Sequence, residues 1–218
     1  MTKIKICGLK TLQDALFAHY AGADALGFVI DVPVNTPRKI SSQEAQSIIS
    51  KLPPYALTVG VVMPSDIQSS LRIIKKTEVD ALQIHGNSPA TMIRELKEKT
   101  RIKIIRSVPI AIDTDVTASI NEIEKYIESG IGAILLDTKG EENAGGTGQK
   151  HDWSKSREIK ESINCPIILA GGLTPENVAD AIRVVEPYAV DVASGVESSP
   201  GIKNHQKIMD FIQNVRNS

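Results

Sequence analysis

The chain has 218 residues, and 41% of them are hydrophobic, which is enough to bury one sizeable core in the size range of single-domain α/β barrels. Its 25 basic and 26 acidic residues leave a net charge of -1. This balance gives no general field for nucleic acid or an anionic membrane surface, so neither is expected as a partner. A local basic patch for a small phosphorylated ligand is not excluded.

Cysteine usage and the N-terminus both indicate a reducing compartment. Cys7 and Cys165 lie far apart, which fits neither a disulfide framework nor a zinc-binding pattern. Residues 1–3 lead directly into a strand-like segment without the apolar core of a signal peptide, and no apolar run is long enough to cross a bilayer. We therefore expect a cytoplasmic protein with no metal site.

Apolar runs of strand length alternate along the chain with stretches of helical spacing. The predicted strands cover residues 3–8, 24–29, 57–63, 80–86, 102–106, 132–137, 166–172 and 189–195. The predicted helices cover residues 11–20, 41–51, 66–76, 89–99, 116–128, 153–162 and 202–215, with a further helix that begins at residues 174–177.

Eight strands that alternate with eight helices predict a single (β/α)8 TIM barrel, one catalytic domain over residues 1–218. The alternative fold is an open, doubly wound sheet. It is disfavoured by the regular count and by the lack of a Gly-x-Gly-x-x-Gly motif after the first strand.

Candidate functional residues lie at the C-terminal ends of the predicted strands, where barrels of this kind build their active sites. These end residues are Cys7, residues 28–29, Met63, His85, Arg106, Asp137, Gly171, Gly172, Ser194 and Gly195. Each polar one could be a chance strand-end residue, and Cys7 alone could be an inert packing cysteine. A thiol, an imidazole, a guanidinium and a carboxylate on one rim together favour a catalytic site.

Side-chain alternation refines this prediction. Lys5 shares a strand face with Cys7, so it lies one layer below the thiol if Cys7 points into the barrel mouth. An ammonium group there would favour the thiolate. Alternatively, Lys5 faces a helix and extends to solvent. By the same alternation Gln83, His85 and Asp137 complete an inward-facing set.

Two further features suggest a phosphorylated, carboxylate-bearing ligand. The glycine-bearing ends at Gly171–Gly172 and Ser194–Gly195 offer backbone N–H groups to a phosphate, although they could also be ordinary turns. Arg38 could bind a carboxylate bidentately or lie in a solvated basic turn. Within the long polar connection at 138–152, the glycine-rich loop at 145–150 is predicted to be a mobile lid or a spacer.

Together these residues resemble the phosphoribosylanthranilate isomerase family, the barrel enzymes of tryptophan biosynthesis. The resemblance spans nearly the whole chain and is strongest in the first block, Lys-Ile-Cys-Gly, and in the last. The matching blocks are residues 5–8, 22–28, 37–41, 82–86, 135–138, 145–148, 170–178 and 190–201.

The resemblance implies an Amadori rearrangement of N-(5-phosphoribosyl)anthranilate to 1-(2-carboxyphenylamino)-1-deoxyribulose 5-phosphate, with no metal or organic cofactor. It implies that Asp137 is the general acid that opens the ribose ring and that Cys7, as thiolate, removes the C2 proton. Substrate binding would fall to Arg38, at the carboxylate, and to His85 and Asp191. The implied phosphate-binding residues are Gly171, Gly172, Ser194 and Gly195.

Two other functions are weighed against this one. The related isomerase of histidine biosynthesis performs the same rearrangement, but it typically has an aspartate where this chain has Cys7. A barrel that binds a phosphosugar without converting it would keep the phosphate site and lose the acid–base pair, whereas Cys7 and Asp137 are both present. Either a monomer or a homodimer is compatible with the sequence.

Overall fold

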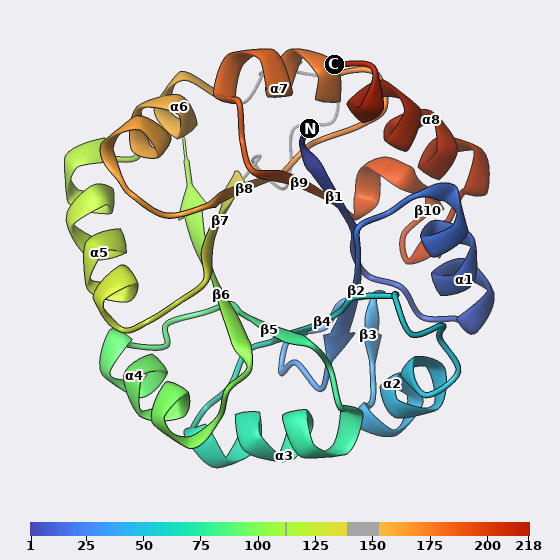
Figure 1. The fold of residues 1–218 in the computed structure, drawn as a ribbon, viewed down its shortest axis with the longest axis horizontal. Coiled ribbons are helices and arrows are strands. Elements are labelled where there is room, and N and C mark those ends of the chain that lie inside the picture. The colour runs from blue at the N-terminus through green and yellow to red at the C-terminus, as the bar shows by residue number, and fades with distance from the viewer. Residues whose placement is uncertain (112, 139–152) are drawn as a thin grey trace.

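The computed structural model describes residues 1–111, 113–138 and 153–218, so the predicted lid at residues 145–150 lies outside the described residues. Within these ranges eight parallel strands form a closed ring that is surrounded by eight helices (Figure 1). The ring runs in the order β1-β9-β8-β7-β6-β5-β4-β2 and closes because β1 also pairs with β2. The predicted (β/α)8 barrel is confirmed.

The ring strands are β1 (Lys3–Ile6), β2 (Ala25–Ile30), β4 (Thr58–Val62), β5 (Ala81–Ile84), β6 (Lys103–Ile110), β7 (Ala133–Thr138), β8 (Ile167–Ala170) and β9 (Ala189–Val192). The helices are α1 (Leu12–Ala21), α2 (Ser42–Ile49), α3 (Ile67–Thr77), α4 (Ala90–Lys99), α5 (Val116–Glu128), α6 (Trp153–Ser162), α7 (Val178–Val185) and α8 (His205–Arg216). Residues Ser194–Val196 form a short 3-10 helix, η1.

Local side-chain chemistry explains several helix starts. Thr11 accepts a hydrogen bond from the backbone of Asp14 at the start of α1. Ser41 and Glu44 form a complete capping box on α2, in which each side chain bonds to the other residue's backbone N–H group. Asp66 caps α3 in the same way as Thr11 caps α1. These helices therefore begin where the sequence predicts. Each cap residue bonds to a backbone N–H group only three residues further along, so the helix start depends on local sequence alone.

Alternation along the strands divides the core into two layers. One set of strand residues, for example Ile134 and Leu136, faces outward and packs under the helices in the large hydrophobic cluster. The other set faces the barrel interior, where Leu135, Ile168 and Ala189 belong to a small separate cluster. The inward-facing positions therefore fill the lower barrel with apolar side chains and bring polar ones to its upper end.

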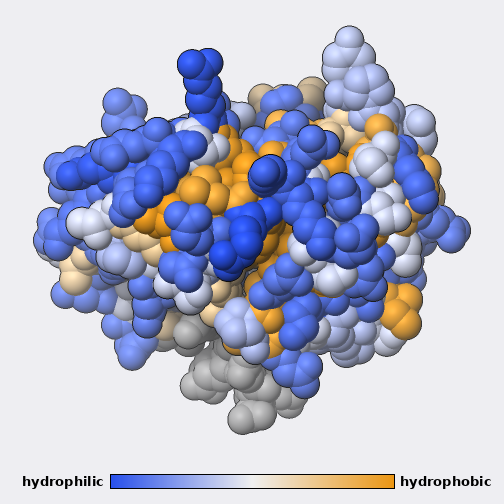
Figure 2. All heavy atoms as spheres, turned by 90° about the horizontal axis from the view of Figure 1, so that it is seen from below, coloured by the Kyte–Doolittle hydropathy of each residue, from blue (hydrophilic) through white to orange (hydrophobic). Residues whose placement is uncertain are grey.

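The exterior shows the complementary pattern. In Figure 2, which views the barrel from the side, hydrophilic side chains cover most of the visible face and hydrophobic areas lie between them. None of the helices in the described ranges is long and apolar enough to cross a membrane.

Four local predictions were wrong. The predicted eighth strand, 189–195, ends at Val192, and its last residues belong to η1. The fifth strand of the barrel, β6, continues to Ile110 instead of ending at residue 106. Helix α7 begins at Val178, because residues 174–177 form a turn in which the Asn177 side chain accepts a bond from the Thr174 backbone. The last predicted helix, 202–215, begins only at His205.

The residues before α8 form an additional element that the sequence did not suggest. The short strands β10 (Glu197–Ser199) and β11 (Ile202–Lys203) pair in an antiparallel hairpin directly after η1. A second short strand outside the ring, β3 (Lys39–Ile40), lies beside β2. The hairpin and β3 both lie next to Arg38. The hairpin carries Glu197, which bonds to Arg38, and β3 begins directly after it.

Candidate active site

The C-terminal ends of the ring strands surround a cavity of about 360 Å³. It is lined by Cys7, Arg38, His85, Asp137, Gly171, Gly172, Asp191 and Ser194, all of them predicted site residues. These residues come from the loops and ends of β1, β2, β5, β7, β8 and β9, so elements that are distant in the chain meet in one site. Gly195, the remaining predicted site residue, follows Ser194 in the chain but is not among the residues that line the cavity.

Cys7 directly follows β1, and its backbone N–H group donates to Val192 of β9 at 2.8 Å. Cys7 is 7% exposed and lines the cavity. Lys5 lies two residues earlier on the same face and is buried, so the inward orientation of Lys5 is confirmed. The Lys5 ammonium group donates to Asp191 Oδ2 at 3.0 Å. A buried ion pair therefore lies beneath the thiol.

Two opposing effects determine the pKa of Cys7. Burial raises the pKa of the thiol above its ordinary value, and the charge of Lys5, which acts in the opposite direction, does not outweigh it. The prediction that the Lys5 ammonium favours the thiolate is confirmed in direction, but burial has the larger effect and the net pKa of Cys7 is raised. Burial also disfavours the ammonium form of Lys5, but the charges of Asp191 and Cys7 keep the Lys5 pKa raised.

Half-buried His85 forms a polar layer with the buried side chains of Gln83 and Ser107, on the opposite side of the barrel from Lys5. The Gln83 amide Nε2 lies 2.7 Å from His85 Nε2 and donates at 3.3 Å to Ser107 Oγ. Burial, followed by the charges of Lys5 and Arg106, lowers the pKa of His85 to about 4. The imidazole is therefore neutral at physiological pH, and with its proton on Nδ1 it accepts the bond from Gln83.

Asp137 lies on the inward face of β7, two residues after Leu135. It is opposite Ala170 in the register between β7 and β8, and it lines the same cavity as Cys7. The predicted inward set of Lys5, Gln83, His85 and Asp137 is thus brought together beneath or around one opening.

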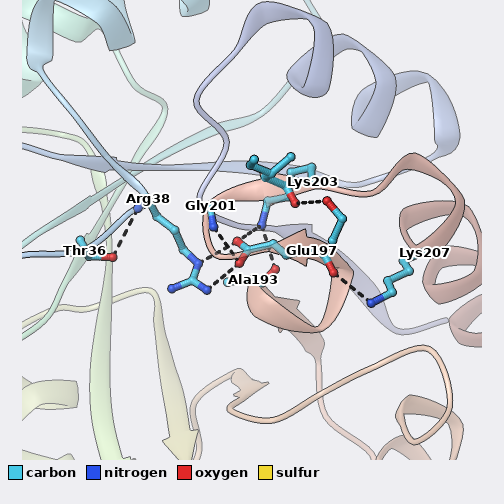
Figure 3. Close-up of polar contacts among 9 residues, drawn as sticks. Thr36, Arg38, Ala193, Glu197, Gly201, Lys203 and Lys207 are labelled. Carbon is cyan, nitrogen blue, oxygen red and sulfur yellow. Dashed lines mark hydrogen bonds and ion pairs between the residues drawn. The ribbon is translucent and has the colours of Figure 1, made fainter.

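Arg38 reaches the cavity from the segment just before β3 (Figure 3). Its Nε and Nη2 atoms donate to the two carboxylate oxygens of Glu197, at 2.8 and 2.7 Å. Lys203 and the backbone of Gly201 also donate to this carboxylate, each at 3.0 Å. Burial by itself raises the pKa of Glu197, but these hydrogen bonds outweigh it and hold the pKa below its usual range.

The loops that follow β8 and β9 form the glycine-rich wall of the cavity. Gly171 and Gly172 have positive φ angles of 84° and 63°, which turn the chain sharply at the end of β8. Ser194 lines the cavity from η1. A Cβ atom on Gly195 would lie only 1.9 Å from the Leu173 carbonyl oxygen, so Gly195 is required for the close packing of these two loops.

Arg106 was predicted on the active-site rim, and this prediction is wrong. It lies in the middle of β6 with its side chain on the outward face. Its guanidinium donates to the carbonyl oxygens of Ile84 and Gly86 and to the Tyr126 hydroxyl, and it stacks over the Tyr126 ring at 4.7 Å. Arg106 therefore ties β5 and α5 to β6 and does not line the cavity.

Sequence reasoning also missed Glu197 and Lys203. Both are buried charged side chains in a segment that was assigned partly to a loop and partly to a helix. The Ser-Pro-Gly turn at residues 199–201 was an available signal for a hairpin, although it did not indicate where the charged side chains would point. In the described ranges, no three His, Cys, Asp or Glu side chains gather in a way that could hold a metal ion.

A closed barrel whose rim cavity combines a thiol, a carboxylate, a guanidinium and two glycine-rich loops defines an acid–base enzyme for a small anionic substrate. Comparison with known proteins specifies the family. The model of the family "N-(5'phosphoribosyl)anthranilate (PRA) isomerase" matches residues 4–214. The chain belongs to this family, and its activity is the isomerisation for which the family is named.

Individual relatives agree with this assignment. An N-(5'-phosphoribosyl)anthranilate isomerase of Methanosarcina mazei is 45% identical, over 99% of this chain and 95% of the relative. The crystal structure of the isomerase from Thermotoga maritima superposes with a TM-score of 0.87 at 38% identity over the full length of both chains. Another isomerase structure, in complex with reduced 1-(o-carboxyphenylamino)-1-deoxyribulose 5-phosphate, gives a TM-score of 0.84 at 36% identity and full coverage of both.

Proposed function

We propose that Cys7 and Asp137 perform the acid–base chemistry of this isomerisation on N-(5'-phosphoribosyl)anthranilate. The observation that carries the proposal is that both side chains line one cavity, together with Arg38 and the glycine loops after β8 and β9. The family assignment supports the substrate, because a relative of known structure holds a reduced form of the rearranged product.

The first step is opening of the ribose ring. The nitrogen lone pair of the substrate forms a C1–N double bond while the C1–O bond breaks, and Asp137 donates a proton to the departing ring oxygen. The product is an iminium ion, that is, a protonated Schiff base, and Asp137 becomes a carboxylate.

The second step is proton transfer from C2 to Cys7 Sγ. The C–H electron pair moves into the C1–C2 bond and the C1–N electrons return to nitrogen, which yields a neutral enolamine. Cys7 enters this step as the thiolate, after its own proton has been lost to solvent, and because burial raises its pKa in the free protein, that form needs additional stabilisation. The positive iminium and the Lys5 ammonium both provide it at the moment of transfer.

Tautomerisation completes the reaction. C1 gains one proton and the C2 hydroxyl loses one, so the enolamine becomes the ketose. This exchange returns Cys7 and Asp137 to their starting protonation states without an oxidant or a cofactor. The electron sink is the substrate's own nitrogen.

Substrate binding uses the two ends of the cavity. Arg38 binds the anthranilate carboxylate, and the loops at Gly171–Gly172 and Ser194–Gly195 bind the phosphate through backbone N–H groups. Asp191, whose Oδ1 atom is buried without a hydrogen-bond partner among the described residues, has acceptor capacity for a ribose hydroxyl. His85, neutral and half-buried, contacts the substrate from the β5 side.

The decisive experiment follows the loss of phosphoribosylanthranilate fluorescence with the purified chain. The wild type is expected to consume the substrate, and Cys7→Ser and Asp137→Asn are each expected to lower kcat by ~10²–10⁴-fold with KM changed only a few-fold. An inactive wild type would contradict the substrate assignment. Variants with near-normal rates would contradict the two residue roles.

The cytoplasmic location, the single-domain organisation and the choice between monomer and homodimer stay predictions of the sequence. Size-exclusion chromatography with light scattering measures the last of these directly.

A further inference from the structure

Glu197 is a buried carboxylate at the junction of three separate segments (Figure 3). Its side chain is 4% exposed. It accepts two hydrogen bonds from Arg38, one from the Lys203 ammonium and one from the Gly201 backbone. These four donors occupy the four acceptor positions of a carboxylate, so the orientation of Glu197 is fixed by its partners.

The position of Arg38 is correspondingly fixed. The guanidinium bonds to Glu197 on one side in a fork-to-fork pair. The stem packs on Gly8, where a Cβ atom would lie 2.8 Å from Arg38 Cδ. The Arg38 backbone N–H group donates to Thr36 Oγ1 at 3.4 Å. Arg38 therefore holds one position in the cavity wall before any substrate arrives.

The charges in this cluster do not cancel. Arg38 and Lys203 are cations, and Glu197 is the anion that both contact. Lys203 is 1% exposed, whereas Arg38 is 24% exposed and lines the cavity. The net positive charge of the cluster is therefore presented to the cavity by Arg38. Its Nη1 atom takes part in neither bond to Glu197, which leaves the N–H groups of Nη1 free to donate to a ligand oxygen.

Lys203 links the same cluster to the other end of the site. Its ammonium donates both to Glu197 and, at 2.8 Å, to the carbonyl oxygen of Ala193. Ala193 immediately precedes Ser194 and η1, and both Ala193 and Ser194 line the cavity. The buried Lys203 ammonium thus contacts both Glu197, which holds Arg38, and Ala193, where the glycine-rich loop begins.

We propose that Glu197 and Lys203 are positioning residues that set the spacing between the two anion-binding ends of the active site. Glu197 orients Arg38 for the carboxylate of the substrate, and Lys203 fixes Glu197 relative to the loop that receives the phosphate. This inference rests on the proposed function for what the two ends bind. Neither residue contacts the reacting atoms, so both act on substrate binding through their neighbours.

A double-mutant cycle at positions 38 and 197 tests the proposal. Glu197→Gln is expected to raise KM by roughly 10- to 100-fold with a smaller change in kcat, because a displaced Arg38 binds the carboxylate poorly. In an Arg38→Met background the same substitution is expected to change KM less than about threefold, because the group it orients is gone. Additive effects would overturn the proposal. If Glu197→Gln does not fold, Glu197→Asp replaces it in the cycle, because the shorter carboxylate keeps the charge but cannot hold Arg38 in the same position.

Two small inhibitors then separate the ends of the site. Anthranilate probes the carboxylate end, and inorganic phosphate probes the loop after β9. Glu197→Gln is expected to weaken inhibition by anthranilate more than by phosphate, and Lys203→Met is expected to weaken inhibition by phosphate by several-fold. Equal weakening of both inhibitors by both variants would indicate general loosening and overturn the proposal.

A matched control is Glu95→Gln on α4, where an exposed carboxylate pairs with Lys99. It removes the same charge far from the cavity and is expected to leave KM unchanged. The rates of the wild type and of the variants distinguish failure of the proposed function from failure of the positioning roles. An inactive wild type contradicts the proposed function, whereas an active wild type with sensitive Arg38 and insensitive Glu197 and Lys203 contradicts only the positioning roles.

Discussion

Lys5 Nζ and Asp191 Oδ2 lie 3.0 Å apart inside the barrel, in a salt bridge whose side chains are 4% and 8% exposed. The two residues are direct partners in the register between β1 and β9. Because Cys7 lies two positions further along the same face as Lys5, this pair forms the floor beneath the thiol. The ion pair therefore serves two purposes, since it satisfies two buried charges and sets the electrostatic field at Cys7.

Lys5→Met is expected to move the rising limb of the kcat/KM–pH profile to higher pH. Lys5 lowers the pKa of Cys7 and Asp191 raises it, so removal of the ammonium takes away the favourable charge and leaves the unfavourable one. Steady-state rates between pH 6 and 10 measure the shift. Asp191→Asn in the same background should move the limb part of the way back, and a Lys5→Met profile identical to the wild type would contradict the role.

Gly27→Ala on β2 is expected to lower kcat and to destabilise the fold by about 1–3 kcal/mol. A Cβ atom at this position would lie 2.9 Å from Cys7 Sγ and 3.0 Å from both Cys7 Cα and Lys5 Cε, so the thiol and its backbone must move. Urea unfolding and steady-state kinetics measure the two effects.

The matched control is Gly60→Ala on β4. There the nearest atoms to a new Cβ are side-chain methyl groups at 3.3–3.5 Å, which can shift by small rotations. This variant is expected to keep kcat. Equal loss of kcat in both variants would show that the contact with Cys7 is not what matters at Gly27.

Arg38→Met is expected to raise KM by roughly 10- to 100-fold, because it removes a charge-assisted contact worth about 1.5–3 kcal/mol. Arg38→Lys keeps the charge but cannot reproduce the fork-to-fork bonds that Nε and Nη2 make to Glu197, so it should recover only part of the loss. Initial rates over a range of substrate concentrations measure both variants. A fall in kcat with constant KM would place Arg38 in the chemistry instead of in binding.

His85→Gln is expected to make stability less dependent on pH. The folded-state pKa of about 4 lies below the ordinary value of 6.5, so between these values the unfolded chain binds a proton that the folded chain does not. The contribution of His85 is therefore fully present above pH 6.5 and decreases by up to about 3 kcal/mol as the pH falls through 4.

Urea unfolding of the wild type and His85→Gln at pH 4.5, 6 and 8 checks this. The difference between the two proteins is the informative quantity, because the titration of carboxylates is common to both and cancels. A constant difference across the three pH values would contradict the lowered pKa of His85.

Much of this protein was predictable from its sequence because the determining interactions are local. Helix caps such as Thr11, Ser41 and Asp66 are adjacent in sequence to the groups they bond. Alternation on a strand places Cys7 above Lys5 whatever the rest of the chain does. Once the elements indicate a closed parallel barrel, all strand ends lie on one side, so Cys7, His85 and Asp137 had to share a rim.

Other features depend on which residues meet across the fold. Lys5 and Asp191 are 186 positions apart, and only the register of β1 against β9 pairs them. Arg106 faces α5 because it alternates with Ile105, which packs inside the barrel, and on the outer face its guanidinium meets the Tyr126 hydroxyl. Glu197 meets Arg38 because a hairpin replaces the start of the last predicted helix.

The direction of the Cys7 pKa shift likewise depends partly on the sequence and partly on the tertiary structure. Which charged groups could lie near the thiol follows from the sequence, and Lys5 is one of them. Whether the pKa rises or falls depends on the balance between loss of water and nearby charge, and burial outweighs Lys5 here. Solvent exclusion results from the packing of all the strand ends together, so only the tertiary structure determines it.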